Sequence, residues 1–81
     1  MDHKQLVWRC RRGVRELDVL LDKYLQSDYP KLDSAGKKAF ERFLETQDPI
    51  IMDWLFGRSI SEDSEIMIII NRLKAISGLK Y

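Results

Sequence analysis

The stretch that decides the fold is residues 14–27, VRELDVLLDKYLQS. Apolar residues recur in it at intervals of three and four, the spacing that places side chains on one face of an α-helix. That face is formed by Val14, Leu17, Leu21 and Tyr24, and it is widened by Leu20 and Leu25. The stretch therefore predicts a helix over residues 14–27.

A shorter helix is predicted before this one. Asp2 is suited to cap its start, and Leu6 and Cys10 lie four residues apart on one face. We expect the helix to run to about Arg12 and to break at Gly13, because glycine is about 1 kcal/mol less favourable than alanine inside a helix. Gly13 is also suited to a turn that requires a positive φ.

Three further helices are predicted after residue 27, beyond a loop over residues 28–32 that contains Pro30. The first has Asp33 as its N-cap, and its face is formed by Ala39, Phe40, Phe43 and Leu44. The second starts with Asp48 as N-cap and Pro49 at the first helical position, carries Ile50, Ile51, Trp54 and Leu55, and ends before Gly57. The third opens at Ser61, carries Ile66, Ile69, Ile70 and Leu73, and stops at Ser77 and Gly78.

The run of residues 66–70 also has strand character, because three consecutive β-branched isoleucines favour a strand locally. We reject a strand because the sequence has no second candidate that could pair with it. The prediction is an all-α bundle of about five helices, forming one domain over residues 1–81.

Composition excludes several classes of protein. The chain has 81 residues, of which 14 are basic and 13 acidic, so no overall field draws it to nucleic acid or anionic lipid. One cysteine excludes an internal disulfide and a multi-cysteine zinc site. Because the longest apolar run has five residues and no signal or transit peptide is recognised, we expect a cytoplasmic protein without membrane insertion.

Catalytic constellations are missing from the sequence. The sole histidine, His3, is expected to be an exposed surface residue, and the four glycines are too far apart to form a phosphate-binding loop. Cys10 is expected to be a small buried hydrophobe rather than a nucleophile. No metal site and no stand-alone enzyme are therefore expected.

The most unusual local feature is a cluster of arginines near the N-terminus. Residues 1–15 carry five basic groups and one acidic group, and four arginines with no lysine fall at positions 9, 11, 12 and 15. One interpretation is a solvated helix end. The other is a docking edge, since the planar guanidinium suits carboxylate or phosphate recognition. Trp8 lies off the face of Leu6 and Cys10, so we expect it to be partly exposed and accessible to a partner.

The run WRCRRGVRELD over residues 8–18 closely resembles the signature of the SdhE family, the small flavinylation factors of succinate dehydrogenase and fumarate reductase. The Arg-Gly-x-x-Glu core of that signature falls on Arg12, Gly13 and Glu16. A second block, with FLE at 43–45, DP at 48–49 and WL at 54–55, also resembles family members. The chain departs from the family at Gly36 and at residues 50–51, outside the signature.

The resemblance implies a five-helix assembly factor that binds the flavoprotein subunit of succinate dehydrogenase or fumarate reductase. It promotes covalent attachment of FAD to a histidine of that subunit, and it is expected to be monomeric when free and to hold no cofactor of its own. The implied partner-binding residues are Arg12, Gly13 and Glu16, supported by Trp8, Arg11, Arg15 and Asp18.

Each of these residues has an implied role. Arg12 would pair with a carboxylate of the client, Gly13 would allow close approach, and Trp8 would be an apolar anchor. Glu16 would meet a basic or amide group, or orient the acceptor histidine; a direct proton transfer is the alternative. Asp18 also has a structural interpretation as the intrahelical partner of Arg15.

Two other functions stay open from the residues alone. A small helix-turn-helix nucleic-acid binder would place the same arginines on phosphate, although Glu16, Asp18 and a pI of 7.9 disfavour it. A protein-interaction module that neutralises an unrelated protein, such as a toxin, is the other alternative.

Overall fold

The computed structural model describes residues 2–78, and these residues form an all-α fold with no strand among them. Met1 and residues 79–81 of the predicted domain lie outside the described residues. The helices are α1 (His3–Arg9), α2 (Arg15–Ser27), α3 (Ser34–Leu44), α4 (Asp48–Leu55) and α5 (Ser64–Ser77), with a 3₁₀ turn η1 (Tyr29–Lys31) between α2 and α3. The prediction of an all-α bundle of five helices is confirmed.

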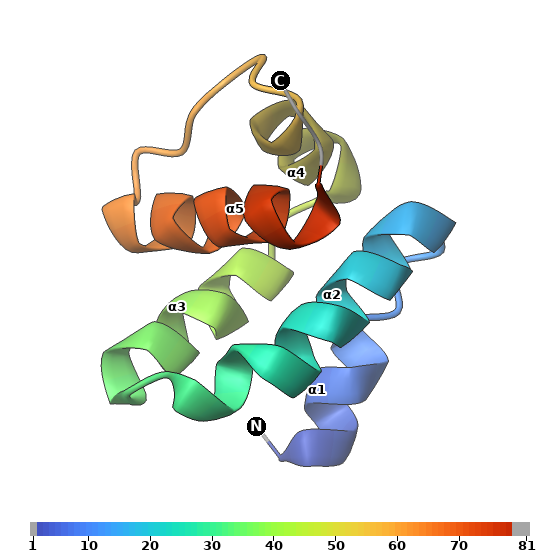
Figure 1. Cartoon of the computed structure of the whole chain (residues 1–81), viewed down its shortest axis with the longest axis vertical. Helices are drawn as coiled ribbons and strands as arrows, with labels where there is room; N and C mark the ends of the chain where they lie inside the picture. Colours follow the sequence, from blue (N-terminus) through green and yellow to red (C-terminus); the bar gives the residue numbers. More distant parts are fainter. Residues whose placement is uncertain (1, 79–81) are drawn as a thin grey trace.

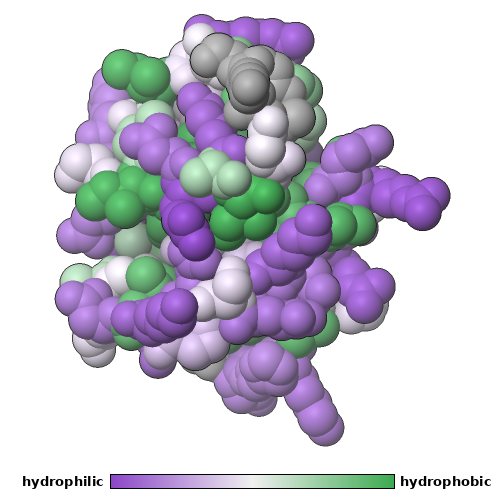
Figure 2. All heavy atoms as spheres, in the orientation of Figure 1, coloured by the Kyte–Doolittle hydropathy of each residue, from purple (hydrophilic) through white to green (hydrophobic). Residues whose placement is uncertain are grey.

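Helix α5 is the centre of the arrangement. It packs on α2, α3 and α4, while α1 is drawn away from α4 and α5, at the N-terminal end of the chain (Figure 1). The helices are amphipathic, so hydrophilic side chains cover much of the face drawn in Figure 2, with hydrophobic patches between them. Within residues 2–78, none of the helices is long and apolar enough to cross a bilayer.

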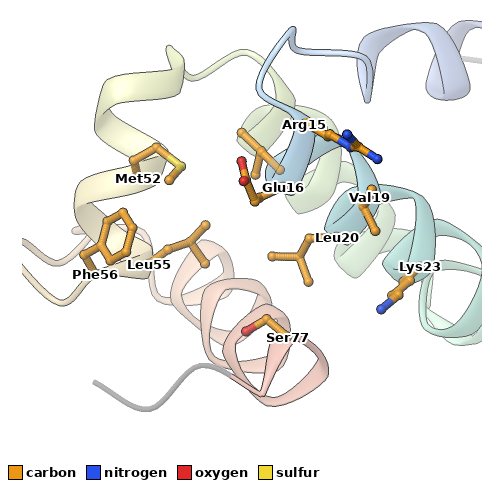
Figure 3. Close-up of a pocket in the computed structure, with 10 residues that line it drawn as sticks. Arg15, Glu16, Val19, Leu20, Lys23, Met52, Leu55, Phe56 and Ser77 are labelled. Atoms are coloured by element: carbon orange, nitrogen blue, oxygen red, sulfur yellow. The ribbon is translucent and has the colours of Figure 1, made fainter.

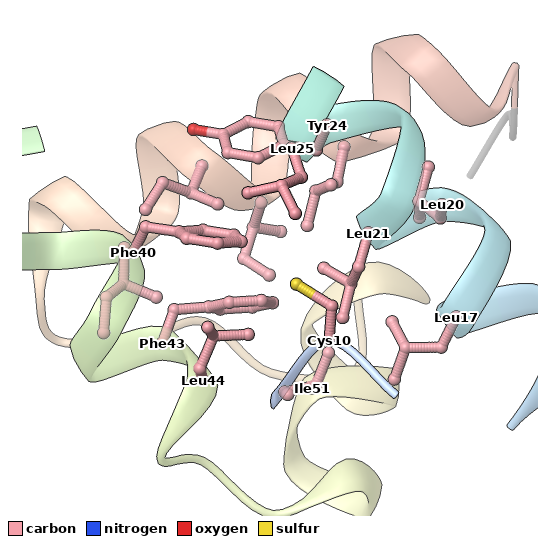
Figure 4. Close-up of a cluster of buried hydrophobic side chains, with 14 of the residues drawn as sticks. Cys10, Leu17, Leu20, Leu21, Tyr24, Leu25, Phe40, Phe43, Leu44 and Ile51 are labelled. Atoms are coloured by element: carbon pink, nitrogen blue, oxygen red, sulfur yellow. The ribbon is translucent and has the colours of Figure 1, made fainter. Parts of the chain in front are cut away.

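The core lies between α2, α3 and α5 and contains a row of aromatic rings. Tyr24 and Phe40 stack with their centroids 5.0 Å apart, and Phe43 continues the row at 5.9 Å from Phe40. Cys10 lies in the same cluster, below Leu21 in the view of Figure 4. Each large apolar side chain buried here contributes about 1.5–3 kcal/mol. The predicted core faces are confirmed except at two positions: Ile50 is exposed, and Val14 is only partly buried.

Two of the predicted helix caps are confirmed. The Asp2 carboxylate accepts from the Gln5 N–H at 2.8 Å, and the Gln5 side chain accepts from the Asp2 N–H, which completes a capping box. The Asp33 carboxylate accepts from the Gly36 N–H at 2.8 Å. Each cap joins a side chain to a backbone N–H three residues later in the chain. A cap of this kind can therefore be recognised from the sequence alone.

Three predicted helix boundaries are wrong. The first helix ends at Arg9, because its last turn closes on Cys10 and the chain then turns away. The N-cap of α4 is Gln47, so Asp48 lies inside the first turn. The last helix starts at Ser64 with Asp63 as its N-cap, because the Asp63 carboxylate accepts from the N–H groups of the first turn.

Candidate functional site

The predicted partner-binding residues gather around one corner, residues 10–14, where the chain passes from α1 into α2. Gly13 has φ +84°, a conformation that L-residues rarely adopt, so the predicted need for a positive φ is confirmed. A Cβ placed on Gly13 would meet no atom within 4 Å. The corner therefore needs glycine for its backbone conformation and leaves open space in front of it.

Arg12 is tied to the connection between α3 and α4 rather than presented to solvent. Its Nε donates to Asp48 Oδ1 at 2.7 Å and its Nη1 donates to the Leu44 carbonyl at 2.5 Å. Its Nη2 donates to the Thr46 carbonyl. The side chain is only 14% exposed. The carboxylate that Arg12 meets is thus the chain's own Asp48, where we had expected a carboxylate of the client.

The physical reason lies in the end of α3. The last carbonyls of a helix have no partner within the helix, and Leu44 is the last residue of α3. A guanidinium can satisfy two carbonyls and a carboxylate together because its donors form a planar fork. Arg12 therefore serves as the shared donor for the connection between α3 and α4.

The Asp18 side chain binds the backbone of the same corner. Its Oδ1 accepts from the backbone N–H of Arg12 at 2.5 Å. No ion pair joins Asp18 to Arg15, both of which lie in the described part, so the intrahelical pairing considered for Asp18 is not formed. Arg12 is thus held by its main chain to α2 and by its side chain to the α3–α4 connection.

The other predicted residues are exposed. Trp8 has 78% of its surface accessible, and Arg11, Gly13, Arg15 and Glu16 are also exposed. Two shallow hollows lie beside Trp8; both are lined by Lys4 and one arginine, and one of them also by Glu41. The expected exposure of Trp8 is confirmed, and it places a large apolar surface beside positive charge.

Glu16 stands at the rim of a groove that sequence patterns did not indicate. The groove has a volume of about 570 Å³ and lies between α2, α4 and the end of α5. Figure 3 shows Glu16 and Leu20 on the α2 side and Met52, Leu55 and Phe56 on the α4 side. The sequence did contain a signal for the groove. Most residues of α4 are apolar, which is more than a helix needs in order to bury one face.

Cys10 is poorly suited to act as a nucleophile. Its side chain is buried, as expected, and its pKa is raised to about 11, first by burial and then by the charge of Asp22. The thiolate is the reactive form of cysteine, and a thiol with such a high pKa is almost fully protonated at neutral pH. His3 is exposed at the start of α1.

Comparison with known proteins decides the family. The sequence matches the profile of the family described as the flavinator of succinate dehydrogenase over residues 4–77. The chain belongs to this family. It is 36% identical over 75 residues to the FAD assembly factor SdhE of Coxiella burnetii, covering 93% of this chain and 92% of that protein. It is 35% identical to the same factor of Pectobacterium atrosepticum, covering 91% and 85%, and 38% identical to that of Colwellia psychrerythraea, covering 86% and 81%.

The resemblance drawn from Arg12, Gly13 and Glu16 is therefore confirmed at the level of the family. In this member of the flavinator family, the described residues contain no group of three or more metal-ligating side chains. Its candidate site consists of a braced corner, exposed cationic and aromatic side chains, and an apolar groove with one carboxylate at its rim. Such a surface is suited to contact with another protein.

Proposed function

We propose that this protein binds the flavoprotein subunit of succinate dehydrogenase, or of fumarate reductase, and promotes covalent attachment of FAD to a histidine of that subunit. The observation that carries the proposal is the docking edge, which we define as Trp8, Arg11, Gly13, Arg15 and Glu16. These residues are exposed together at a corner that the rest of the fold holds in place. They fall within the run of residues 8–18 that resembles the family signature.

The docking edge continues into the groove between α2 and α4. Glu16 belongs to both, so a partner that meets the exposed arginines can also insert an apolar side chain over Leu20 and Phe56. Apolar anchors in pockets, surrounded by polar contacts, contribute most of the affinity in many protein interfaces. The partner segment that fits is therefore apolar at its centre and carries a basic or amide group toward Glu16.

The factor acts by binding rather than by turnover. It supplies no cofactor of its own, and the flavin and the client provide the groups that react. A partner that binds one arrangement of the client more tightly shifts the population toward that arrangement, to the extent of the difference in affinity. In this proposal the factor acts as a monomer in the cytoplasm, before the client joins its membrane partners.

The competing nucleic-acid function is disfavoured by the same edge. Glu16 stands among its arginines, and the Arg12 guanidinium is occupied within the chain. Contacts with DNA phosphate would give a steep dependence of binding on salt. Retention on DNA that falls steeply between low and moderate salt would favour that alternative over ours.

The decisive experiment measures covalent flavin on the client subunit. The client is expressed in cells that lack any flavinylation factor, with and without this protein, and flavin fluorescence is read in a denaturing gel. We expect a fluorescent band of the client subunit only when the factor is present. Equal fluorescence in both samples would contradict the proposal, and a pulled-down partner that is not a flavoprotein would favour the toxin-neutralising alternative.

A further inference from the structure

We propose that Arg12 and Asp48 form an internal clamp that positions the docking edge, and that Arg12 does not itself contact the client. This inference rests on the proposed function, because it concerns how the same edge is presented. It changes the role of the arginine in the family signature from a partner contact to a positioning residue.

The hydrogen bonds that Arg12 makes within the chain leave few of its donors for a partner. All three nitrogens of the guanidinium are used, on the Asp48 carboxylate and on the carbonyls of Leu44 and Thr46. The side chain is 14% exposed and that of Asp48 is 27% exposed. To reach a client carboxylate, Arg12 would have to leave three acceptors behind in a partly buried place, and unpaired buried polar groups are costly.

The clamp joins parts of the chain that are far apart in sequence. Arg12 and Asp48 are separated by 36 residues, and the main chain of Arg12 is held to α2 by Asp18. The two neighbours of Arg12, namely Arg11 and Gly13, therefore take their positions from a fixed residue. The placement of the exposed cation and of the open glycine corner follows from this brace.

The clamp also connects the two walls of the groove. Asp48 lies in the first turn of α4, and Met52 follows four residues later on the same helix face. Phe56, the C-cap residue of α4, lines the groove together with Met52. Glu16 and Leu20 form the opposite wall on α2. An ion pair from the α1–α2 corner to the first turn of α4 therefore helps to set the spacing between the walls.

The test uses Asp48→Asn and measures the affinity for the purified client flavoprotein subunit by titration. The substitution keeps the charge of Arg12 and removes the carboxylate that competes for it. If Arg12 meets a client carboxylate, binding stays equal or becomes tighter. If the clamp positions the edge, we expect affinity to fall about tenfold, a loss within the range of couplings between contacting residues.

A second variant, Arg12→Lys, keeps the positive charge but loses the planar fork, so it is expected to weaken binding to a similar degree. The double variant combines Asp48→Asn with Arg12→Lys. It should bind the client no more weakly than the single variant with the lower affinity, because each substitution removes the same clamp. Additive losses would overturn the proposal. So would client affinity in Asp48→Asn that is equal to or tighter than that of the parent.

The matched control is Asp28→Asn. It breaks the ion pair in which Arg72 Nε lies 2.5 Å from Asp28 Oδ2, between α2 and α5 and away from the corner. All variants are compared at a temperature where circular dichroism shows them folded. The control should bind the client within about twofold of the parent, as expected for a surface change outside the interface. A parent protein that fails to bind the client would contradict the proposed function, whereas a parent that binds and an unaffected Asp48→Asn would overturn only the clamp.

Discussion

Two corners of this molecule share one backbone conformation and are held in different ways. Gly13 has φ +84° and Gly57 has φ +73°, and a Cβ on either would meet no atom within 4 Å. The Gly13 corner is tied by Arg12 to residues more than 30 positions away. The Gly57 corner is tied locally, with the Arg58 N–H donating to the Asp53 carbonyl at 2.9 Å.

The difference indicates which corner is suited to recognition. Hydrogen bonds between near neighbours set the local shape of a corner but do not join it to distant elements. A corner held by distant residues takes its shape from the whole fold, so its exposed side chains are presented in one arrangement. Preorganisation of this kind reduces the ordering cost of binding. The following predictions test this comparison, in order of decreasing effect on the free energy of unfolding.

The largest effect is expected from Trp54→Ala, which truncates a buried aromatic side chain of α4. Trp54 is 9% exposed and lies in the last turn of α4, immediately before the Gly57 corner. Truncation of a buried aromatic residue costs about 3–5 kcal/mol, a large share of the stability of a small domain. Urea unfolding followed by circular dichroism measures the loss. Ile68→Ala, on an exposed side chain of α5, is the control, and equal midpoints for Trp54→Ala and the parent would contradict the core assignment.

Alkaline pH is expected to destabilise the core that contains Cys10 and Tyr24. Burial raises the pKa of Cys10 from 9.0 to about 11 and that of Tyr24 from 10.0 to about 12. Because both folded-state values lie above the unfolded ones, the unfolded chain releases its protons first. The stability is fully present below about pH 9 and is lost as the pH rises toward 11 and 12. Urea unfolding at pH 7.5 and 10.5 measures this, and equal free energies of unfolding at both would contradict it.

The sequence predicted the parts of this comparison that depend on near neighbours. The caps at Asp2 and Asp33 and the buried faces of the helices follow from spacings of three or four residues, and the positive φ at Gly13 follows from the residue type itself. The partner of Arg12 could not be found in this way, because it lies 36 residues away and depends on how α3 and α4 pack. The groove was missed for the same reason, since its walls belong to different helices.

A smaller effect on stability is expected from a matched pair, Gly13→Arg and Gly57→Arg. Each places a side chain at a positive φ in open space, so each should cost about 1 kcal/mol. Only Gly13→Arg should prevent complex formation with the client flavoprotein, because it fills the space in front of the docking edge. Size-exclusion chromatography of the mixed proteins measures this. A Gly57→Arg variant that also fails to bind would contradict the distinction between the two corners.

The smallest effect on stability is expected from Glu16→Ala, together with a large effect on function. Glu16 is exposed at the rim of the groove, and surface substitutions usually change the free energy of unfolding by no more than about 0.5 kcal/mol. We expect covalent flavin on the client to be abolished or greatly lowered while the melting temperature stays near that of the parent. The control is Glu62→Ala, which removes an exposed carboxylate from the segment after the Gly57 corner.

The same variant separates two roles for the carboxylate. If Glu16 only docks, Glu16→Ala binds the client weakly, and a large excess of the variant restores flavin attachment. If Glu16 organises the acceptor site, the variant binds but fails at any concentration. We expect the second outcome, because Trp8, Arg11 and the apolar groove supply contacts that do not depend on this carboxylate. Full flavinylation by Glu16→Ala at stoichiometric concentration, in cells without another factor, would contradict the assignment of Glu16 to the functional site. The braced corner would then have no functional residue assigned to it.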